Sequence, residues 1–556
     1  MWPVHDSHAL MNKPPVTLLL VAALAAAFSA SLVAQTSSPA PTPAPSGIRL
    51  PALGDSAGED FTVGTERRLG DQIMGELRRD PDYLDDPLLL DYLYSLWSPL
   101  VAAARQRGDI TAETDALLAW ETFLVRDRAV NAFALPGGFV GVHLGLISMT
   151  ASRDELASVL AHELSHVTQR HIARGIASAS RQSLVGLAAM VLGVLAASRA
   201  GSGDAAQAVI VGSQAAMVQG QLNFSRDMER EADRIGWGVY SGAGFAPAGM
   251  AAMFEKLDNA SRLNDSGAYP YLRSHPLTVE RIGEARTRVE AATGPRSAAQ
   301  APLDHLLMRA RARVLMDGSV QSLRRQQDLD APPAAKAVTP IEQTVSLYAS
   351  AMASLQLRDA TRAQAAADAA MALARSVAPG DGRAARALTL LQAQALLANG
   401  QAQRALALLE TPALAATTDT AGAGARPLLL ARAQAALEAA RGGNNAALRA
   451  STEALQTWVA ERRQDAAAWS MLAQCAEALG LHLRALRAEA EARAALGDLG
   501  GAIDRLRAAQ RQARNATGAP DFIEVSIIDA RLRDIRAQRR AQLAAARGER
   551  EERPPQ

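Results

Sequence analysis

A long alanine-rich stretch over residues 339–540 constrains the fold of this chain more than any other feature. Alanine is the strongest helix former, and short breaks at 398–400 and 479–481 divide the stretch into helical segments. Pairs of such helices cannot bury their apolar faces alone, so they stack on neighbouring pairs. Residues 339–540 are therefore predicted to form an α-solenoid, with a plain helical bundle as the alternative.

The helical array also carries a weak internal repeat. A third break lies at 496–498. After each of the three breaks, a small residue is followed by a second residue four positions later, and this second residue is apolar in two of the three copies. The pairs are Ala405 with Leu409, Ala485 with Glu489, and Ala502 with Leu506. Together with Trp469, Leu472 and Ala473, these pairs resemble a degenerate tetratricopeptide array.

The N-terminal end carries an uncharged apolar run at residues 16–33, followed by small residues and a Ser/Pro/Thr-rich stretch. This order predicts a secretory signal peptide over 1–34 and a disordered linker over 35–59. Met11 is an alternative start. A retained membrane anchor is the other interpretation, because about 18 apolar residues can span a bilayer. Either way, the body of the protein is predicted to lie outside the cytoplasm.

The charge balance and the cysteine count exclude several classes of protein. The chain has 58 basic and 57 acidic residues, a net charge of +1, so no global basic field favours nucleic acid. Its single cysteine, Cys475, excludes an internal disulfide and a cysteine-rich zinc ribbon. Partners must therefore be inferred from motifs rather than from composition.

The region before the helical array mixes helices with a short β-rich segment. Apolar residues recur three and four apart up to about residue 108, which predicts covering helices. Short β-type runs, punctuated by Pro136 and two glycines, predict a small sheet over 120–149. One long helix is expected at 152–174, and two apolar helices are expected at 184–197 and 205–218.

These segments define the predicted fold class, which is mainly α. An α+β domain with a small sheet is expected at 60–300, and an irregular connector follows at 301–338. The helical array then ends in a charged tail at 541–556, which is predicted to be disordered.

Two histidines stand four residues apart in the helix predicted at 152–174. Because their side chains leave one face about one turn apart, His162 and His166 can meet a single ion. Glu163 follows the first histidine and is placed to hold a water beside that ion. The flanking residues are apolar, and burying two histidines and a glutamate is costly unless a metal satisfies them. This segment is therefore predicted to bind zinc.

Tetrahedral zinc with two histidine ligands needs a third protein ligand. The best candidate is Glu229 in the predicted helix SRDMEREADRIG, where Asp233 lies one turn further on and is placed to hydrogen-bond a ligand histidine. Glu231 is the competing carboxylate. It points about 200° away from Glu229 on a helix, so it is expected to be a solvated charge.

A third histidine close to the pair is not expected to bind the ion. The metzincin pattern needs a glycine and a histidine three and six residues after His166, where this chain has Gln169 and Ile172. His171 lies five residues after His166, on a different face of a continuous helix. It is therefore predicted to be a polar surface residue.

The segments HELSH and EREAD, with NAFALPGGFV upstream and RSHPLTVERI downstream, resemble the gluzincin-type peptidase family M48. The resemblance is strong over 131–282 and weaker over 301–465. It implies an α+β zinc metallopeptidase domain at 60–300 that holds one Zn²⁺ per chain. The zinc ligands that it implies are His162, His166 and Glu229, with Glu163 as the general base.

The resemblance implies two further roles. The segment 131–140 would form an edge strand beside the cleft, where an extended substrate adds by backbone pairing, although an ordinary hairpin is the alternative. His275 would correspond to a histidine that fills the open zinc position in a resting state. The residues expected in the substrate strand are Asn131, Ala132, Phe133, Ala134 and Leu135.

The similarity to periplasmic members of the family implies a function. The chain would be an exported zinc endopeptidase that degrades misassembled outer-membrane β-barrel proteins, and its repeats would contact the barrel-assembly machinery, with peripheral membrane association. Members with several membrane spans do not fit, because the sequence has no second convincing span. The alternatives are a chaperone-like solenoid adaptor with little or no proteolysis and a structural zinc site. The structural site is the weaker of these, because structural zinc is normally closed by four ligands.

Overall fold

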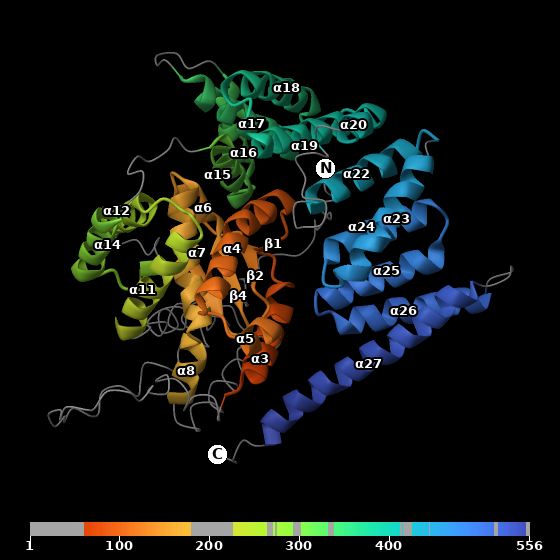
Figure 1. Cartoon of the computed structure of the whole chain (residues 1–556). Helices are drawn as coiled ribbons and strands as arrows, with labels where there is room; N and C mark the ends of the chain where they lie inside the picture. Colours follow the sequence, from red (N-terminus) through yellow and green to blue (C-terminus); the bar gives the residue numbers. More distant parts are fainter. Residues whose placement is uncertain are drawn as a thin grey trace, which may run out of the picture. The chain divides into compact units, whose positions relative to one another are not determined.

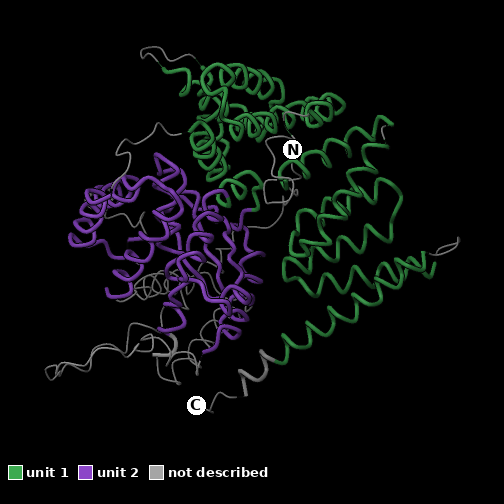
Figure 2. The backbone as a smooth tube through the Cα atoms, viewed as in Figure 1, with its two compact units in different colours: residues 1–12, 85–94, 301–548 green, residues 13–84, 95–300, 549–556 purple. Residues whose placement is uncertain are grey.

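The computed structural model of the chain divides into two compact units (Figure 2). The N-terminal unit is mainly Ser95–Gln300, and the C-terminal unit is mainly Ala301–Gly548 together with Asp85–Tyr94. The residues that the structure describes are 61–178, 226–263, 271–272, 275–292, 302–331, 338–411, 414, 425–443, 445–515 and 521–551. The expected signal peptide, the linker and the two apolar helices predicted between 184 and 218 lie outside these residues.

The N-terminal unit contains a four-stranded mixed sheet in the order β1-β2-β4-β3. Strand β1 (Tyr83–Leu84) is antiparallel to β2 (Glu121–Val125), and β2 is parallel to β4 (Phe139–His143). Strand β3 (Ala132–Leu135) lies at the edge and is antiparallel to β4. The small sheet expected over 120–149 is confirmed.

Glycines shape the hairpin between β3 and β4. Gly137 and Gly138 have φ angles of 83° and 88°, which L side chains rarely adopt. A Cβ atom on Gly141 would lie 2.5 Å from the ring of Phe133 and 2.8 Å from the ring of Phe123. The absence of a side chain at Gly141 therefore lets these two rings meet edge to face, with centroids 5.8 Å apart.

Helices pack against this sheet in the N-terminal unit (Figure 1). Residues of α3 and of the sheet share an apolar cluster that includes Met74, Phe123 and Phe139. Helix α7 packs against β3, β4, α11 and α12, and all its residues from Glu155 to Val167 are buried. The helices are α3 (Val63–Leu77), α4 (Pro87–Arg107), α5 (Ala112–Leu117), α6 (Leu144–Met149), α7 (Arg153–Thr168), α8 (His171–Ser178), α11 (Arg226–Gly242), α12 (Ala248–Leu263) and α14 (Val279–Ala291).

The prediction of one continuous helix over 152–174 is wrong. Helix α7 ends at Thr168 and α8 begins at His171, because Arg170 adopts a left-handed φ of 50°. The guanidinium of Arg170 donates to Glu66 at 2.9 Å and to the carbonyl of Phe61 at 2.8 Å. These two bonds stabilise the break, which redirects the chain immediately after the histidine pair.

The C-terminal unit is an array of helices in which each of the helices from α17 to α25 packs against the next helix described along the chain. This arrangement confirms a mainly α fold with a solenoid-like region, whereas the tetratricopeptide assignment stays a prediction. The helices are α15 (Leu303–Met316), α16 (Val320–Gln327), α17 (Pro340–Gln356), α18 (Ala360–Val377), α19 (Gly382–Ala398), α20 (Ala402–Leu409), α22 (Ala425–Ala440), α23 (Asn445–Glu461), α24 (Ala466–Ala478), α25 (His482–Ala495), α26 (Leu499–Asn515) and α27 (Phe522–Glu551). A 3₁₀ turn, η1, spans Asp328–Asp330.

Helix ends in this unit fall at the breaks read from the sequence. Gly400, Gly480 and Gly497 have φ angles of 71°, 74° and 79°, the left-handed conformation that ends a helix.

Two expectations differ from the structure. The predicted irregular connector at 301–338 contains α15 and α16, and α27 continues into the predicted disordered tail. Apolar residues of α15 such as Leu307 are buried, which explains why that segment is helical and packed.

The start of α4 belongs to the C-terminal unit and is held there by one buried and one partly exposed ion pair. Arg311 donates to both oxygens of Asp86, at 2.8 and 2.7 Å. Arg426 donates to Asp85 at 2.6 Å and also pairs with Asp465 at 2.7 Å. In the part of the chain that the structure describes, no helix has both the length and the hydropathy needed to span a bilayer.

Candidate metal centre

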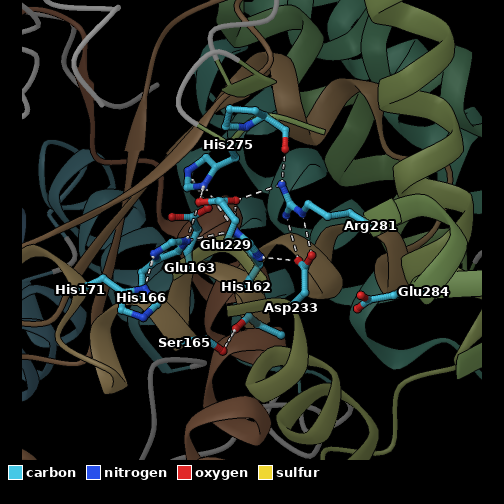
Figure 3. Close-up of polar contacts among 12 residues, drawn as sticks. His162, Glu163, Ser165, His166, His171, Glu229, Asp233, His275, Arg281 and Glu284 are labelled. Atoms are coloured by element: carbon cyan, nitrogen blue, oxygen red, sulfur yellow. Dashed lines mark hydrogen bonds and ion pairs between the residues drawn. The ribbon is translucent and has the colours of Figure 1, made fainter. Parts of the chain in front are cut away.

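Four side chains from three parts of the N-terminal unit converge at one point (Figure 3). His162 and His166 lie on α7, Glu229 lies near the start of α11, and His275 precedes α14. One donor atom from each residue lies within 4.8 Å of the other three, and all four residues are buried. The structure thus brings together the three ligands proposed from spacing and the histidine proposed from the family resemblance.

The distances between these atoms fit a tetrahedral zinc ion. Ligand atoms about 2.1 Å from such an ion lie roughly 3.4 Å from one another. His162 Nε2 lies 3.0 Å from His166 Nε2 and 3.4 Å from Glu229 Oε2. Glu229 Oε1 lies 3.5 Å from His166 Nε2 and 3.0 Å from His275 Nδ1. Imidazole nitrogens and a carboxylate are also the donors that zinc prefers, so the residues present fit this metal.

Glu163 lies beside the cluster and has unsatisfied oxygens. Its side chain is fully buried, and neither carboxylate oxygen receives a hydrogen bond from the described residues. His275 Nε2 lies 3.5 Å from Glu163 Oε1, beyond an ordinary hydrogen bond. A buried carboxylate without hydrogen bonds costs free energy, and such groups are concentrated at functional sites.

His162 is supported from behind by an acidic and a basic residue, Asp233 and Arg281, which we call the Asp233 arm. Asp233 Oδ1 lies 3.0 Å from His162 Nδ1. Arg281 of α14 holds this carboxylate through Nε to Oδ2 at 2.6 Å and Nη2 to Oδ1 at 2.9 Å. Arg281 Nη1 also lies 3.0 Å from Glu229 Oε2 and donates to the carbonyl of Pro276 at 2.8 Å. Arg281 therefore ties α11 and α14 to the segment that carries His275.

His166 is supported by a different group, His171, Glu231 and Arg174, which we call the His171 arm. His171 Nδ1 lies 2.8 Å from His166 Nδ1, and His171 Nε2 lies 3.1 Å from Glu231 Oε2. Arg174 Nη1 donates to the same oxygen at 2.8 Å. The prediction of a surface position for His171 is wrong, because the break at Arg170 turns its buried ring back onto His166. Glu231 is likewise paired and half-buried rather than solvated.

The charges of the site act in opposite directions on its two paired histidines. Burial acts to lower the pKa of His162, but its bonds to Asp233 and Glu229 outweigh burial and raise the pKa to about 10. Burial and the neighbouring His162 hold the pKa of His166 well below its usual value. Burial acts to raise the pKa of Glu229, yet His275 and His162 bring it well below the usual range. Without a metal, the cluster therefore combines an ionised Glu229, a neutral His166 and a protonated His162, whose proton must leave when a metal binds.

Local sequence features place α7 and α11 side by side. Ser152 caps the start of α7, with its hydroxyl accepting from the backbone of Glu155 at 3.2 Å. A Cβ atom on Gly236 of α11 would lie 3.2 Å from the carbonyl of Ala161 and from the hydroxyl of Ser165. Glycine at this position therefore permits the close helix approach that brings Glu229 to the histidine pair.

Two residues near the cluster were not identified from the sequence. Arg281 stands in the segment RSHPLTVERI, but a contact between helices gives no signal in residue spacing. Tyr271 is buried with its ring centroid 4.7 Å from that of His275, and its backbone N–H donates to the carbonyl of Val130 at 3.4 Å. Burial raises the pKa of Tyr271, so its hydroxyl is protonated and is a potential donor.

The strand proposed to pair with substrate is an edge strand that packs against α7. Ala132, Ala134 and Leu135 are buried within β3, and Asn131 precedes it. The backbone N–H of His143 donates to the carbonyl of Asn131 at 3.1 Å. In antiparallel strands every second residue bonds to the partner strand, so Asn131 and Phe133 bond to β4 whereas Ala132 and Ala134 do not. The N–H and C=O groups of Ala132 and Ala134 therefore point away from β4, towards the side of β3 on which the described residues form no further strand.

Comparisons with known proteins agree with this geometry. The family model of peptidase family M48 matches residues 103–289. A relative from Vibrio cholerae is 38% identical over 264 residues, which cover 48% of this chain and 52% of the relative. The beta-barrel assembly-enhancing protease of Escherichia coli strain K12 is 36% identical over 272 residues, with the same shares covered. A mitochondrial metalloendopeptidase of Schizosaccharomyces pombe is 37% identical over 166 residues, 30% of this chain and 45% of the relative.

The matches cover the whole cluster. The chain spans about half the length of the curated bacterial relatives it matches. The four clustered side chains, Glu163 and both arms lie inside the matched segment. The resemblance drawn from HELSH and EREAD is confirmed, and residues 103–289 of this chain form a peptidase family M48 domain.

Proposed function

We propose that the chain is an exported zinc-dependent endopeptidase. The observation that carries this proposal is the buried Glu163 carboxylate, which lacks hydrogen bonds from the described residues and lies beside the cluster of His162, His166 and Glu229. A structural metal site would gain nothing from such a neighbour, because its stability depends on closed coordination and satisfied polar groups. The family match and the names of the relatives, which describe proteases, support the same conclusion.

The chain's own residues divide the work of hydrolysis. His162, His166 and Glu229 would hold one zinc ion, which when bound lowers the pKa of water and polarises a carbonyl. Glu163 accepts the proton of the attacking water and delivers it to the leaving amide nitrogen. Asp233 accepts the Nδ1 proton of His162, so Nε2 is the nitrogen of that ring that faces the cluster and would bind the ion once its own proton has left.

An extended peptide would bind along β3 by backbone pairing. The outward N–H and C=O groups of Ala132 and Ala134 would pair with the substrate, and the buried side chains would hold the strand in place. Ala134→Pro removes one of these donors and should lower kcat/KM for peptides about tenfold, the effect of roughly one hydrogen bond to the transition state. Ala134→Ser keeps the donor and is the matched control. Equal kcat/KM values in the two variants would contradict the pairing.

His275 would hold the enzyme in a resting state. Its Nδ1 lies 3.3 Å from His162 Nε2 and 3.0 Å from Glu229 Oε1, where it competes with water for the open position. His275→Ala should therefore raise the rate of proteolysis. Unchanged or lower activity would count against this role.

The substrates and the location of the protein belong to this proposal as well. The relatives named for β-barrel assembly support misassembled outer-membrane β-barrel proteins as substrates, in the periplasm. The helical array of the C-terminal unit would supply the contact with the barrel-assembly machinery. Complementation separates this function from that of an adaptor, because Glu163→Gln should abolish rescue by an enzyme but not rescue by an adaptor.

Zinc content and casein cleavage, measured on the same samples, test the enzyme directly. The wild type should contain one zinc per chain and cleave casein. Glu163→Gln should keep the zinc and lose at least about a hundredfold in rate, because general base catalysis contributes at least that much. Glu284→Gln, an exposed glutamate of α14, is the matched control and should behave as wild type. A Glu163→Gln variant of full activity would refute the mechanism.

A further inference from the structure

We infer that His171 is a positioning residue that fixes the tautomer of His166 for metal binding. This inference rests on the proposed function, because it assumes that His166 binds the ion through Nε2. Its basis is the contact between the two Nδ1 atoms at 2.8 Å, made by two buried rings whose centroids lie 4.8 Å apart.

The direction of this hydrogen bond follows from the chemistry of imidazole. A neutral ring that offers the Nε2 lone pair to a metal carries its proton on Nδ1. His166 must therefore donate from Nδ1, and His171 must accept at Nδ1. With its lone pair used in this way, neutral His171 carries its own proton on Nε2, which lies 3.1 Å from Glu231 Oε2. The carboxylate of Glu231, held by Arg174, accepts that proton and so selects the required tautomer of His171.

The geometry is specific rather than a consequence of crowding. The His171 ring is oriented by contacts at both nitrogens, Nδ1 with His166 and Nε2 with Glu231. The contact depends on the left-handed residue Arg170, because only the break after α7 returns the first residue of α8 to the histidine pair. Partners of this kind that orient ligand histidines typically change metal affinity about 10–100-fold when they are removed.

Two substitutions of His171 separate positioning from packing. In His171→Asn, the amide oxygen occupies the place of Nδ1, so the acceptor for His166 remains while the contact with Glu231 is lost. In His171→Gln, the amide reaches the place of Nε2, so the contact with Glu231 remains while the acceptor is lost. A role in packing alone favours glutamine, because it is larger and keeps the link to Glu231.

The experiment measures the zinc dissociation constant by competition with a chromophoric chelator, and the visible spectrum of the cobalt(II)-substituted protein, on the full chain. His171→Asn should stay close to wild type in both measurements. His171→Gln should weaken zinc binding about 10–100-fold and alter the cobalt spectrum. His143→Gln removes another buried imidazole of the same unit and should leave zinc affinity unchanged. Circular dichroism of the metal-free proteins checks that each variant is folded.

The outcomes distinguish this inference from the proposed function. If the wild type binds one zinc and His171→Gln binds it equally well, or if His171→Asn loses as much affinity as His171→Gln, the inference is overturned and the enzyme assignment stands. If the wild type itself fails to bind stoichiometric zinc, the proposed function falls, and the inference falls with it.

Discussion

The two paired histidines of α7 are supported in different ways. The Asp233 arm places a charged, buried carboxylate directly on His162, and Arg281 holds that carboxylate with two bonds. The His171 arm places a neutral ring between His166 and its carboxylate, and the Glu231 side chain is 28% exposed. Direct bonds to an ionised, buried acceptor are stronger than relayed ones near solvent. Zinc binding by His162 should therefore depend on the charge of its carboxylate partner, whereas zinc binding by His166 should depend on which nitrogen carries the proton.

The largest effect is expected when the Asp233 arm is cut. Asp233→Ala removes one of the two carboxylates that pair with the buried guanidinium of Arg281 and leaves only Glu229. The free energy of unfolding should therefore fall by about 3 kcal/mol. Zinc affinity should fall towards the upper end of about 10–100-fold. Denaturant unfolding and chelator competition measure the two effects, with exposed Asp227→Ala on the same helix as the control. A loss of zinc affinity no larger than that of His171→Gln would contradict the claim that the Asp233 arm supports zinc binding more strongly than the His171 arm.

His143 serves as a reference, because it is a buried histidine without an arm. Its Nδ1 lies 3.5 Å from Asp127, and burial lowers its pKa from 6.5 to about 4. The folded state thus binds this proton more weakly than the unfolded chain does. The neutral His143 ring therefore adds to the free energy of unfolding fully above about pH 6.5, and this contribution is lost as the pH falls towards 4. The loss between pH 7 and pH 5 should be about 2 kcal/mol.

Urea unfolding of the metal-free protein at several pH values measures how the free energy of unfolding depends on pH. His143→Gln should flatten the pH dependence relative to wild type. Parallel curves for the two proteins would show that His143 titrates normally in the folded state, contrary to its burial.

A smaller effect is expected at the far end of the His171 arm. Glu231→Gln keeps an oxygen that accepts from His171 Nε2 but removes the charge, so zinc affinity should fall only about two- to fivefold. Arg230→Gln, exposed on the same helix, is the matched control. A hundredfold loss for Glu231→Gln would mean that charge, not proton placement, dominates this arm as well.

The smallest effect is expected at Arg174, whose ion pair with Glu231 is partly exposed. Such pairs contribute about 0–1 kcal/mol, so Arg174→Gln should change zinc affinity by no more than about fivefold. Isothermal titration of the metal-free protein with zinc provides the measurement. A larger change would place Arg174 inside the metal-binding machinery rather than at its periphery.

The arms also show how far the sequence predicts the site. His162 and His166, and likewise Glu229 and Asp233, are spaced by one turn on single helices, so helical periodicity alone places each pair on one face. His171 could not be placed in this way, because the left-handed Arg170 ends α7 before it. That break depends on contacts with Glu66 and Phe61, about a hundred residues earlier, which no local pattern reveals.

The fold shows the same division. Glycine breaks such as Gly400 and Gly480 predict the ends of the array helices because positive φ values are a local property. The two-residue strand β1 is too short for any periodicity and exists only through its pairing with β2. Helices α15 and α16 were missed because their charged residues obscured an apolar face that buries Leu307 and Leu323.

The most direct test of the central claim is a paired measurement on the wild type and Glu229→Ala, with zinc content and peptide cleavage determined on the same samples. One zinc per chain and cleavage in the wild type, with both lost in the variant, is the result predicted by a site that joins α11 to the histidine pair of α7. Retention of zinc and cleavage by Glu229→Ala would contradict it.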